Sequence, residues 1–231
     1  MEYTLSYTDK LNFLWNDFVE AIKDKVSNKE LSKNFLQSIK KTSKKNINGF
    51  NSNASMAPNC KQCQKKCCEN IIGRINLSLS DIAELMDNGL ENAIEGDYKG
   101  FILMLDKYLE TGDMSAFNII DLSDNETSGI KFKPSIKKND DLACYFYKNG
   151  KCSIYKNRPL SCRLFPHQYQ HETKTLILDK NCESLRTFKS ENESNNAIKS
   201  CINLENALNK DISLLMLHRD ALDTIGFCKY L

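Results

Sequence analysis

The stretch Cys60-Lys-Gln-Cys63-Gln-Lys-Lys-Cys67-Cys68 decides how this chain is organised, because it places four cysteines within nine residues. The residues between the cysteines are Lys and Gln, whereas buried core thiols would need apolar neighbours. A C-x2-C turn lets two thiolates reach one metal from a tight loop, since Zn–S bonds are only about 2.3 Å long. The stretch therefore predicts a metal site built from cysteine sulfur.

The adjacent pair Cys67 and Cys68 adds a geometric constraint. Neighbouring side chains of an extended backbone point to opposite faces, so one metal atom rarely suits both sulfurs. Either the two thiolates serve different metal atoms, as in a binuclear site or a cluster, or one of them is a buried or reactive thiol.

A second group of cysteines follows far downstream, at Cys144, Cys152, Cys162 and Cys182. The Asn149-Gly150 dipeptide is typical of a two-residue hairpin turn, which would bring Cys144 and Cys152 together. We expect this group and the first one to complete a site of eight cysteines.

Positive charge accompanies the second group. Eight thiolates around two Zn²⁺ ions would leave a charge of about −4, which nearby cations must offset. From Cys144 to Arg163 the chain has no acidic residue, and its basic residues are Lys148, Lys151, Lys156, Arg158 and Arg163. We assign Arg158 and Arg163 to cofactor binding, as N–H donors toward sulfur. A solvated basic face explains the same charges.

Three other side chains are of types that can bind metal. His167 follows Phe165-Pro166, and its imidazole could replace a thiolate, although a hydrogen-bonded loop histidine fits the same position. Cys201 falls on the apolar stripe of a predicted helix, which favours a core thiol. Cys228 lies beside Phe227 near the end of the sequence and stays unassigned.

Composition narrows the class of protein. The 231 residues can bury a hydrophobic core, and a formal charge of +2 provides no global field for nucleic acid. The N-terminus lacks the pattern of a secretory signal, and no apolar run approaches the roughly 18 residues of a membrane span. We expect a cytoplasmic protein without membrane contact. Disulfides are rare in a reducing cytosol, so metal binding is the preferred use of the ten cysteines.

The predicted fold class is α+β, with a small irregular cysteine-rich metal-binding core of short strands flanked by amphipathic helices. The predicted parts are a helical hairpin over residues 1–41, a linker over 42–58, the cysteine-rich domain over 59–190 and a helix packing on it over 191–231. Apolar spacing and caps predict helices at 9–26, 27–39, 80–88, 98–110 and 195–222. Short β-leaning runs predict strands at 71–77, 117–122, 129–133, 143–148 and 173–178.

The chain resembles the zinc- or iron-chelating proteins named after their CxxCxxCC motif. The resemblance covers residues 58–185 and rests on Cys60, Cys63, Cys67, Cys68, Cys144, Gly150-Lys-Cys152-Ser-Ile-Tyr155, Arg158-Pro159, Cys162-Arg163, Phe165-Pro166 and Cys182. This chain departs from the motif in having three residues, not two, before Cys67-Cys68. The resemblance implies cysteine-bound metal, either zinc or an iron–sulfur cluster, and few members have an assigned reaction.

Two functions are compatible with such a site. In the first, the metal does redox, radical or metal-assisted chemistry, which requires an open coordination position or a strained cluster. In the second, a structural zinc stiffens a partner-binding surface, and the N-terminal helices dock a protein partner. Cysteine spacing does not choose between zinc and a cluster, because soft sulfur ligands suit both.

Overall fold

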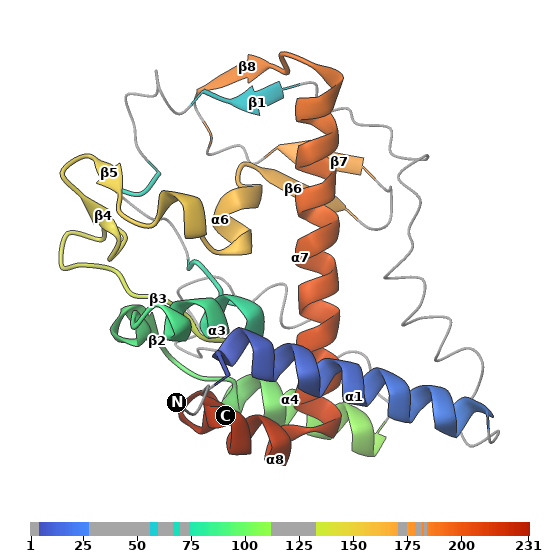
Figure 1. The fold of residues 1–231 in the computed structure, drawn as a ribbon. Helices are drawn as coiled ribbons and strands as arrows, with labels where there is room; N and C mark the ends of the chain where they lie inside the picture. The colour runs from blue at the N-terminus through green and yellow to red at the C-terminus, as the bar shows by residue number, and fades with distance from the viewer. Residues whose placement is uncertain are drawn as a thin grey trace. The chain divides into compact units, whose positions relative to one another are not determined.

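The computed structural model describes residues 5–27, 56–59, 67–69, 74–111, 133–170, 175–178, 182 and 184–231 (Figure 1). These residues form helices and four two-stranded antiparallel sheets, which pair β1 with β8, β2 with β3, β4 with β5 and β6 with β7. The predicted α+β class is confirmed. Among the described residues, no helix is both long enough and apolar enough to cross a membrane.

The chain divides into two compact units. The terminal unit comprises residues 1–40, 72–137 and 207–231, and the cysteine unit comprises residues 41–71 and 138–206. These units interleave along the sequence, whereas the four predicted parts follow one another, and the predicted boundaries stay a prediction. Nine of the ten cysteines fall within the ranges of the cysteine unit.

Helix α1 (Tyr7–Ser27) of the terminal unit confirms the predicted helix at 9–26. Its start is capped by Ser6: the backbone N–H of Asp9 donates to the Ser6 hydroxyl, which in turn donates to the Asp9 carboxylate. Leu11 and Phe18 lie on one face of the helix and are buried. The second predicted helix, at 27–39, lies almost entirely outside the described residues.

Helix α3 (Leu79–Asp87) begins at a capping box, in which Ser78 and Asp81 each bind the other's backbone N–H. Ile82 and Leu85 are buried as predicted, and Gly89 has the positive φ of a helix C-terminus. The 3₁₀ helix η1 (Glu91–Ala93) follows, and helix α4 (Lys99–Thr111) confirms the helix predicted at 98–110.

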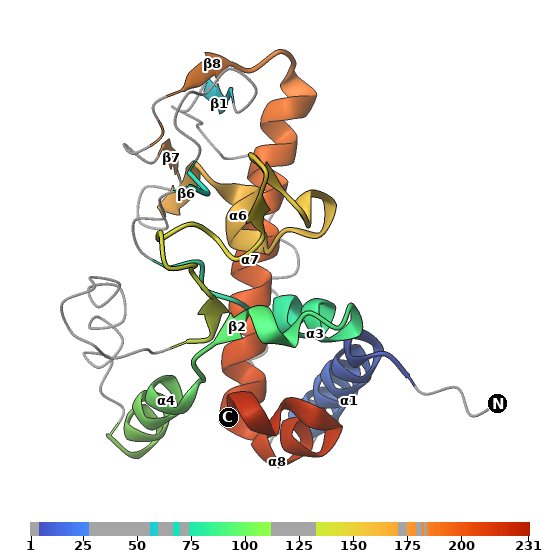
Figure 2. The same cartoon turned by 90° about the vertical axis from the view of Figure 1, so that its left-hand side faces the viewer.

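The last predicted helix is interrupted. Helix α7 (Glu191–Leu217) ends before His218, and α8 (Arg219–Leu222), η3 (Asp223–Phe227) and η4 (Cys228–Tyr230) follow it. The prediction of one helix over 195–222 was wrong at this point, because His218 has φ −138°, which no helix accommodates. The His218 ring packs edge-on against Phe18, at a centroid distance of 5.2 Å. In Figure 2, α8 lies beside α1 within the terminal unit.

The strands of the terminal unit are shorter than predicted. Strand β2 (Ile94–Glu95) pairs with β3 (Ser135–Ile136), and Asn76 forms a single bridge to Ser135. The described part of the strand predicted at 71–77 contributes only that bridge. The predicted strands at 117–122 and 129–133 lie, except for Lys133, outside the described residues.

The cysteine unit holds the remaining strands. Strand β1 (Met56–Pro58), at the end of the predicted linker, pairs with β8 (Leu185–Thr187), and β6 (His167–Gln170) pairs with β7 (Thr175–Leu178). Of the strand predicted at 143–148, only β4 (Tyr147–Lys148) forms. It pairs with β5 (Lys151–Cys152), and η2 (Tyr155–Asn157) and the short helix α6 (Leu160–Leu164) follow.

The core of the cysteine unit is aliphatic rather than cysteine-rich. In the first part of α7, Ile198 and Cys201 pack with Leu164 of α6. Cys144 and Cys201 are buried, whereas the other described cysteines of this unit are half-buried or exposed. The prediction of a cysteine-rich core is not shown by the described residues, because most of their thiols are only half-buried.

A buried carboxyl group lies at the start of α3 in the terminal unit. The Leu79 backbone N–H donates to Oδ2 of Asp211 at 3.0 Å, and within the described part of the chain Oδ1 has no hydrogen-bond partner. Burial raises the pKa of Asp211 from 3.8 to about 8. The stability that its neutral form contributes is fully present below pH 3.8 and is lost as the pH rises through about 8.

Asp211→Asn should therefore flatten the pH dependence of stability. Between pH 6 and 9 we expect the wild type to lose on the order of 1 to 3 kcal/mol of unfolding free energy relative to the variant, because only the wild type gains a buried charge. Urea unfolding at several pH values measures this. Asp220→Asn, at an exposed site on α8, is the control, and parallel pH curves for wild type and Asp211→Asn would contradict the assignment.

A side chain at Gly226 should lower the stability of the fold. Its φ is +107°, and an added Cβ would lie 2.9 Å from Cε1 of Tyr7. We expect Gly226→Ala to lower the unfolding free energy by roughly 1 to 3 kcal/mol. Gly89→Ala has a positive φ but no atom within 4 Å of the new Cβ, so it should cost only about 1 kcal/mol in the same denaturant titration. Equal losses would show that the contact with Tyr7 is unimportant.

Candidate metal centre

The β4–β5 hairpin positions the first downstream cysteines. Its turn residues, Asn149 and Gly150, have φ of 51° and 75°, the conformation of the two-residue turn that this dipeptide predicts. The register places Cys152 directly opposite Tyr147, three residues beyond Cys144. The predicted hairpin is confirmed and contains Cys152, whereas Cys144 lies three residues before its first strand and forms a bridge to Lys138.

The end of the cysteine motif lies against this hairpin. The backbone N–H of Cys144 donates to the carbonyl of Cys68 at 2.8 Å. In addition, the Tyr147 hydroxyl donates to the carboxylate of Glu69, and this bond raises the pKa of Tyr147 to about 12. Two stretches separated by more than 70 residues therefore meet at Cys68 and Cys144, while the prediction that their sulfurs share one centre stays a prediction.

Five of the predicted ligands interact electrostatically. The Cys68 thiol donates a hydrogen bond to Cys67, which lowers the pKa of Cys67 to about 6 against an opposing effect of burial. The same bond, burial and the charges of Cys67, Cys144 and Cys162 raise the pKa of Cys68. Burial and the charges of Cys152 and Cys67 raise the pKa of Cys144. Cys67, Cys68 and Cys144 thus each affect the pKa of another member of the group, whereas Cys162 affects that of Cys68 and Cys152 that of Cys144.

Cys182 lies beside the other end of the motif stretch. Its thiol faces the carbonyl of Ser184 at 3.8 Å, and the backbone N–H of Asn59 donates to that same carbonyl at 2.9 Å. The Ser184 hydroxyl returns a bond to the Asn59 carbonyl at 3.3 Å. Asn59 directly precedes Cys60 in the sequence, while Cys60 and Cys63 themselves lie outside the described residues.

A complete ligand set is not assembled within the described residues. No three of their Cys, His, Asp or Glu side chains are grouped so that they could hold a metal ion. Two of the eight predicted ligands, Cys60 and Cys63, lie outside the described residues. What the described residues do show is the backbone contact between the two cysteine stretches, at Cys68 and Cys144.

Arg158 and Arg163 have different surroundings. The Arg158 guanidinium stacks over the Tyr155 ring at 3.9 Å and donates through Nε to the Tyr155 carbonyl at 3.0 Å, and its charge helps to lower the pKa of Cys67. The Nε of Arg163 donates to the carbonyl of Arg158. The positive charge of Arg158 therefore favours the thiolate form of a predicted ligand, Cys67.

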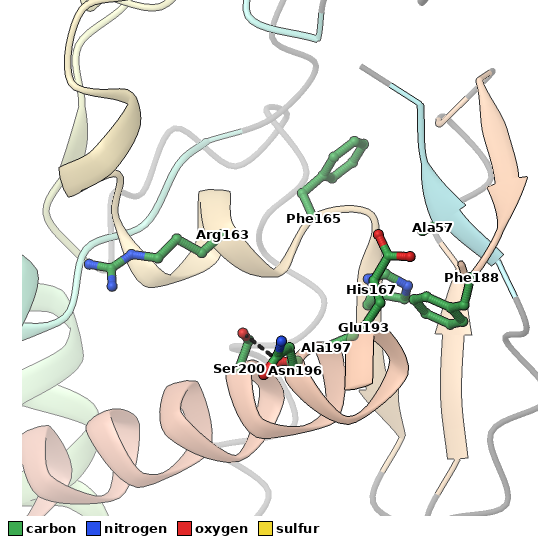
Figure 3. Close-up of a pocket in the computed structure, with 9 residues that line it drawn as sticks. All are labelled: Ala57, Arg163, Phe165, His167, Phe188, Glu193, Asn196, Ala197 and Ser200. Atoms are coloured by element: carbon green, nitrogen blue, oxygen red, sulfur yellow. Dashed lines mark hydrogen bonds between the residues drawn. The ribbon is translucent and has the colours of Figure 1, made fainter. Parts of the chain in front are cut away.

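His167 lines a small pocket of about 190 Å³ in the cysteine unit. It is the first residue of β6 rather than a loop residue, it is 6% exposed, and its ring stacks on Phe188 at 5.8 Å. Figure 3 shows His167, Glu193 and Phe188 gathered on one side, whereas the Arg163 guanidinium points away from them. This pocket could not be predicted from sequence, because its lining residues come from several elements.

The structure also places the two cysteines that we left out of the site. Cys201 is 3% exposed in the core of the cysteine unit, which confirms the expectation of a core thiol, and burial raises its pKa to about 12. Cys228 is exposed in η4 of the terminal unit.

Clustered thiols carried by a tight hairpin and a short helix are typical of cysteine-rich metal-binding domains. Comparison with family models agrees: the CxxCxxCC model, described as "Putative zinc- or iron-chelating domain", matches residues 59–183, more than half of the chain. The chain belongs to the CxxCxxCC family. No curated protein and no solved structure matched it.

Thiol reactivity should follow this arrangement. In the metal-free protein at pH 7, we expect iodoacetamide to modify Cys67 at least 10-fold faster than Cys201, because the thiolate is the nucleophile and Cys67 is exposed with a lowered pKa. Mass spectrometry of time-quenched samples measures both rates. Cys228 is the control for exposure alone, and modification of Cys201 as fast as Cys67 would contradict the described burial.

Proposed function

We propose that this protein binds zinc or an iron–sulfur cluster at a site shared by its two cysteine stretches. The proposed ligands are Cys60, Cys63, Cys67, Cys68, Cys144, Cys152, Cys162 and Cys182. The observation that carries the proposal is the 2.8 Å bond from the Cys144 N–H to the Cys68 carbonyl, which joins the motif to the downstream hairpin. Membership of a zinc- or iron-chelating family supports the same chemistry.

The donor chemistry fits a soft metal. As thiolates, Cys67, Cys68 and Cys144 would repel one another, so a cation that binds them removes the repulsion. We propose that Arg158 offsets part of the remaining negative charge, since its guanidinium already favours the thiolate of Cys67. Bound zinc would supply Lewis acidity, whereas a cluster would supply electron transfer.

We propose further that redox or metal-assisted chemistry, where it occurs, uses the side of the centre that carries Cys67. Cys67 is exposed and Arg158 is half-buried beside it, so a reactant could approach there. A purely structural zinc would instead be closed by four protein ligands. Either use needs reduced thiols, which favours a cytoplasmic location.

Metal content should depend on the proposed ligands and not on the core thiol. After anaerobic purification we expect Cys63→Ala and Cys162→Ala each to lose at least half of the metal bound by the wild type, because each removes a thiolate ligand. Metal analysis, sulfide analysis and visible absorption measure the content and distinguish zinc from a cluster. Cys201→Ala is the matched control and should keep its metal. Full metal content in both ligand variants would contradict the proposed site.

A further inference from the structure

We infer that Tyr147 and Glu69 form a latch that holds the Cys67-Cys68 pair beside the downstream cysteines before metal binds, an inference that rests on the proposed metal-binding function. Glu69 directly follows the pair, and Tyr147 lies in β4. The Tyr147 hydroxyl donates to Oε1 of Glu69, across a separation of 78 residues. Both residues belong to the cysteine unit.

The latch lies on the side of the hairpin that bears a cysteine. Tyr147 and Cys152 are directly opposed in the β4–β5 pair, and side chains of directly opposed residues share one face of the ladder. Tyr147 therefore extends from the Cys152 face of the hairpin to the residue next to Cys68. The turn that fixes this face, at Asn149 and Gly150, is a tight two-residue turn.

A second hydrogen bond, made by the backbone, fixes the orientation of the Cys67-Cys68 pair. The Cys144 N–H donates to the Cys68 carbonyl at 2.8 Å, and the Tyr147 N–H donates to the Cys144 carbonyl at 2.8 Å. One hydrogen bond alone would leave the motif free to turn about it. The backbone bond at Cys68 and the side-chain bond at Glu69 hold two consecutive residues, and so they fix the orientation of the Cys67-Cys68 pair.

Such a contact should act on metal affinity. A loop that is ordered only by the metal loses its conformational entropy at the binding step, whereas a loop already held by protein contacts loses less. Hydrogen bonds made directly to ligating side chains typically change metal affinity by about 10- to 100-fold when they are removed, whereas the latch acts on the backbone that carries the ligands. Because the latch is partly exposed, we expect the lower end of that range.

The test measures zinc affinity by competition with a chromophoric chelator, using the full-length protein. Tyr147→Phe and Glu69→Ala should each weaken zinc binding by roughly 10-fold, and the double variant should be no weaker than either one. Glu69→Gln keeps an acceptor for the Tyr147 hydroxyl and should retain most of the affinity. Tyr145→Phe, two residues away in the same segment, is the control and should bind as the wild type does.

A general loss of folding would look different. If the latch only stabilised the fold, Tyr147→Phe would lower the thermal unfolding temperature of the metal-free protein without changing zinc affinity, and this result would overturn the inference. Additive losses in the double variant, or wild-type affinity in both single variants, would overturn it as well while leaving the proposed function intact. A wild-type protein that binds no zinc would overturn both the latch and the zinc form of the proposed function.

Discussion

The meeting of two distant stretches at Cys68 and Cys144 is the constraint on which the rest of the cysteine unit depends. The backbone bond between them closes a long loop, and closing it costs conformational entropy that other contacts must offset. The Asn149-Gly150 turn and the packing of Leu164 on α7 supply part of that compensation without metal. Metal binding would then add stability to a backbone arrangement that these contacts already favour.

Both ends of the motif stretch are held by downstream residues. Asn59 is bonded to Ser184, next to Cys182, and Cys68 is bonded to Cys144. Asn59, which directly precedes the motif in the sequence, therefore lies near Cys182, and Cys68 lies near Cys144. Cys67 and Cys68 lie in a turn, and a hydrogen bond between their side chains alters the pKa of both, so the expectation for an extended backbone, that the two sulfurs face opposite sides, does not apply here.

Local signals in the sequence predicted the local features of the structure. The Ser6 cap of α1, the positive φ at Gly89 and the turn at Asn149-Gly150 depend on neighbouring residues, so they could be predicted without the fold. The break at His218 could not, because no Gly or Pro marks it and the His218 ring packs against Phe18, 200 residues away. The pocket around His167 and the contact between Tyr147 and Glu69 were missed for the same reason.

The sequence predicted the chemical class of the site, which the family match supports, but not the surroundings of its residues. Cysteine spacing indicated a metal site, and the structure joins the two stretches that carry the spacing. Arg158 and Arg163 have different surroundings because η2 and α6 turn the chain between them. The number of basic residues in the sequence does not reveal that difference. The core position of Cys201 was predicted correctly, because an apolar helical stripe identifies a core position from the sequence alone.

The central claim is that sulfurs from both stretches bind one shared centre. The most direct measurement is a cadmium-113 to proton correlation spectrum of the cadmium-substituted protein, in which each ligating cysteine shows coupling from its β-protons to the metal. We expect a cadmium resonance coupled both to cysteines of the 60–68 motif and to cysteines between 144 and 182. Resonances coupled to only one of the two stretches would contradict the account.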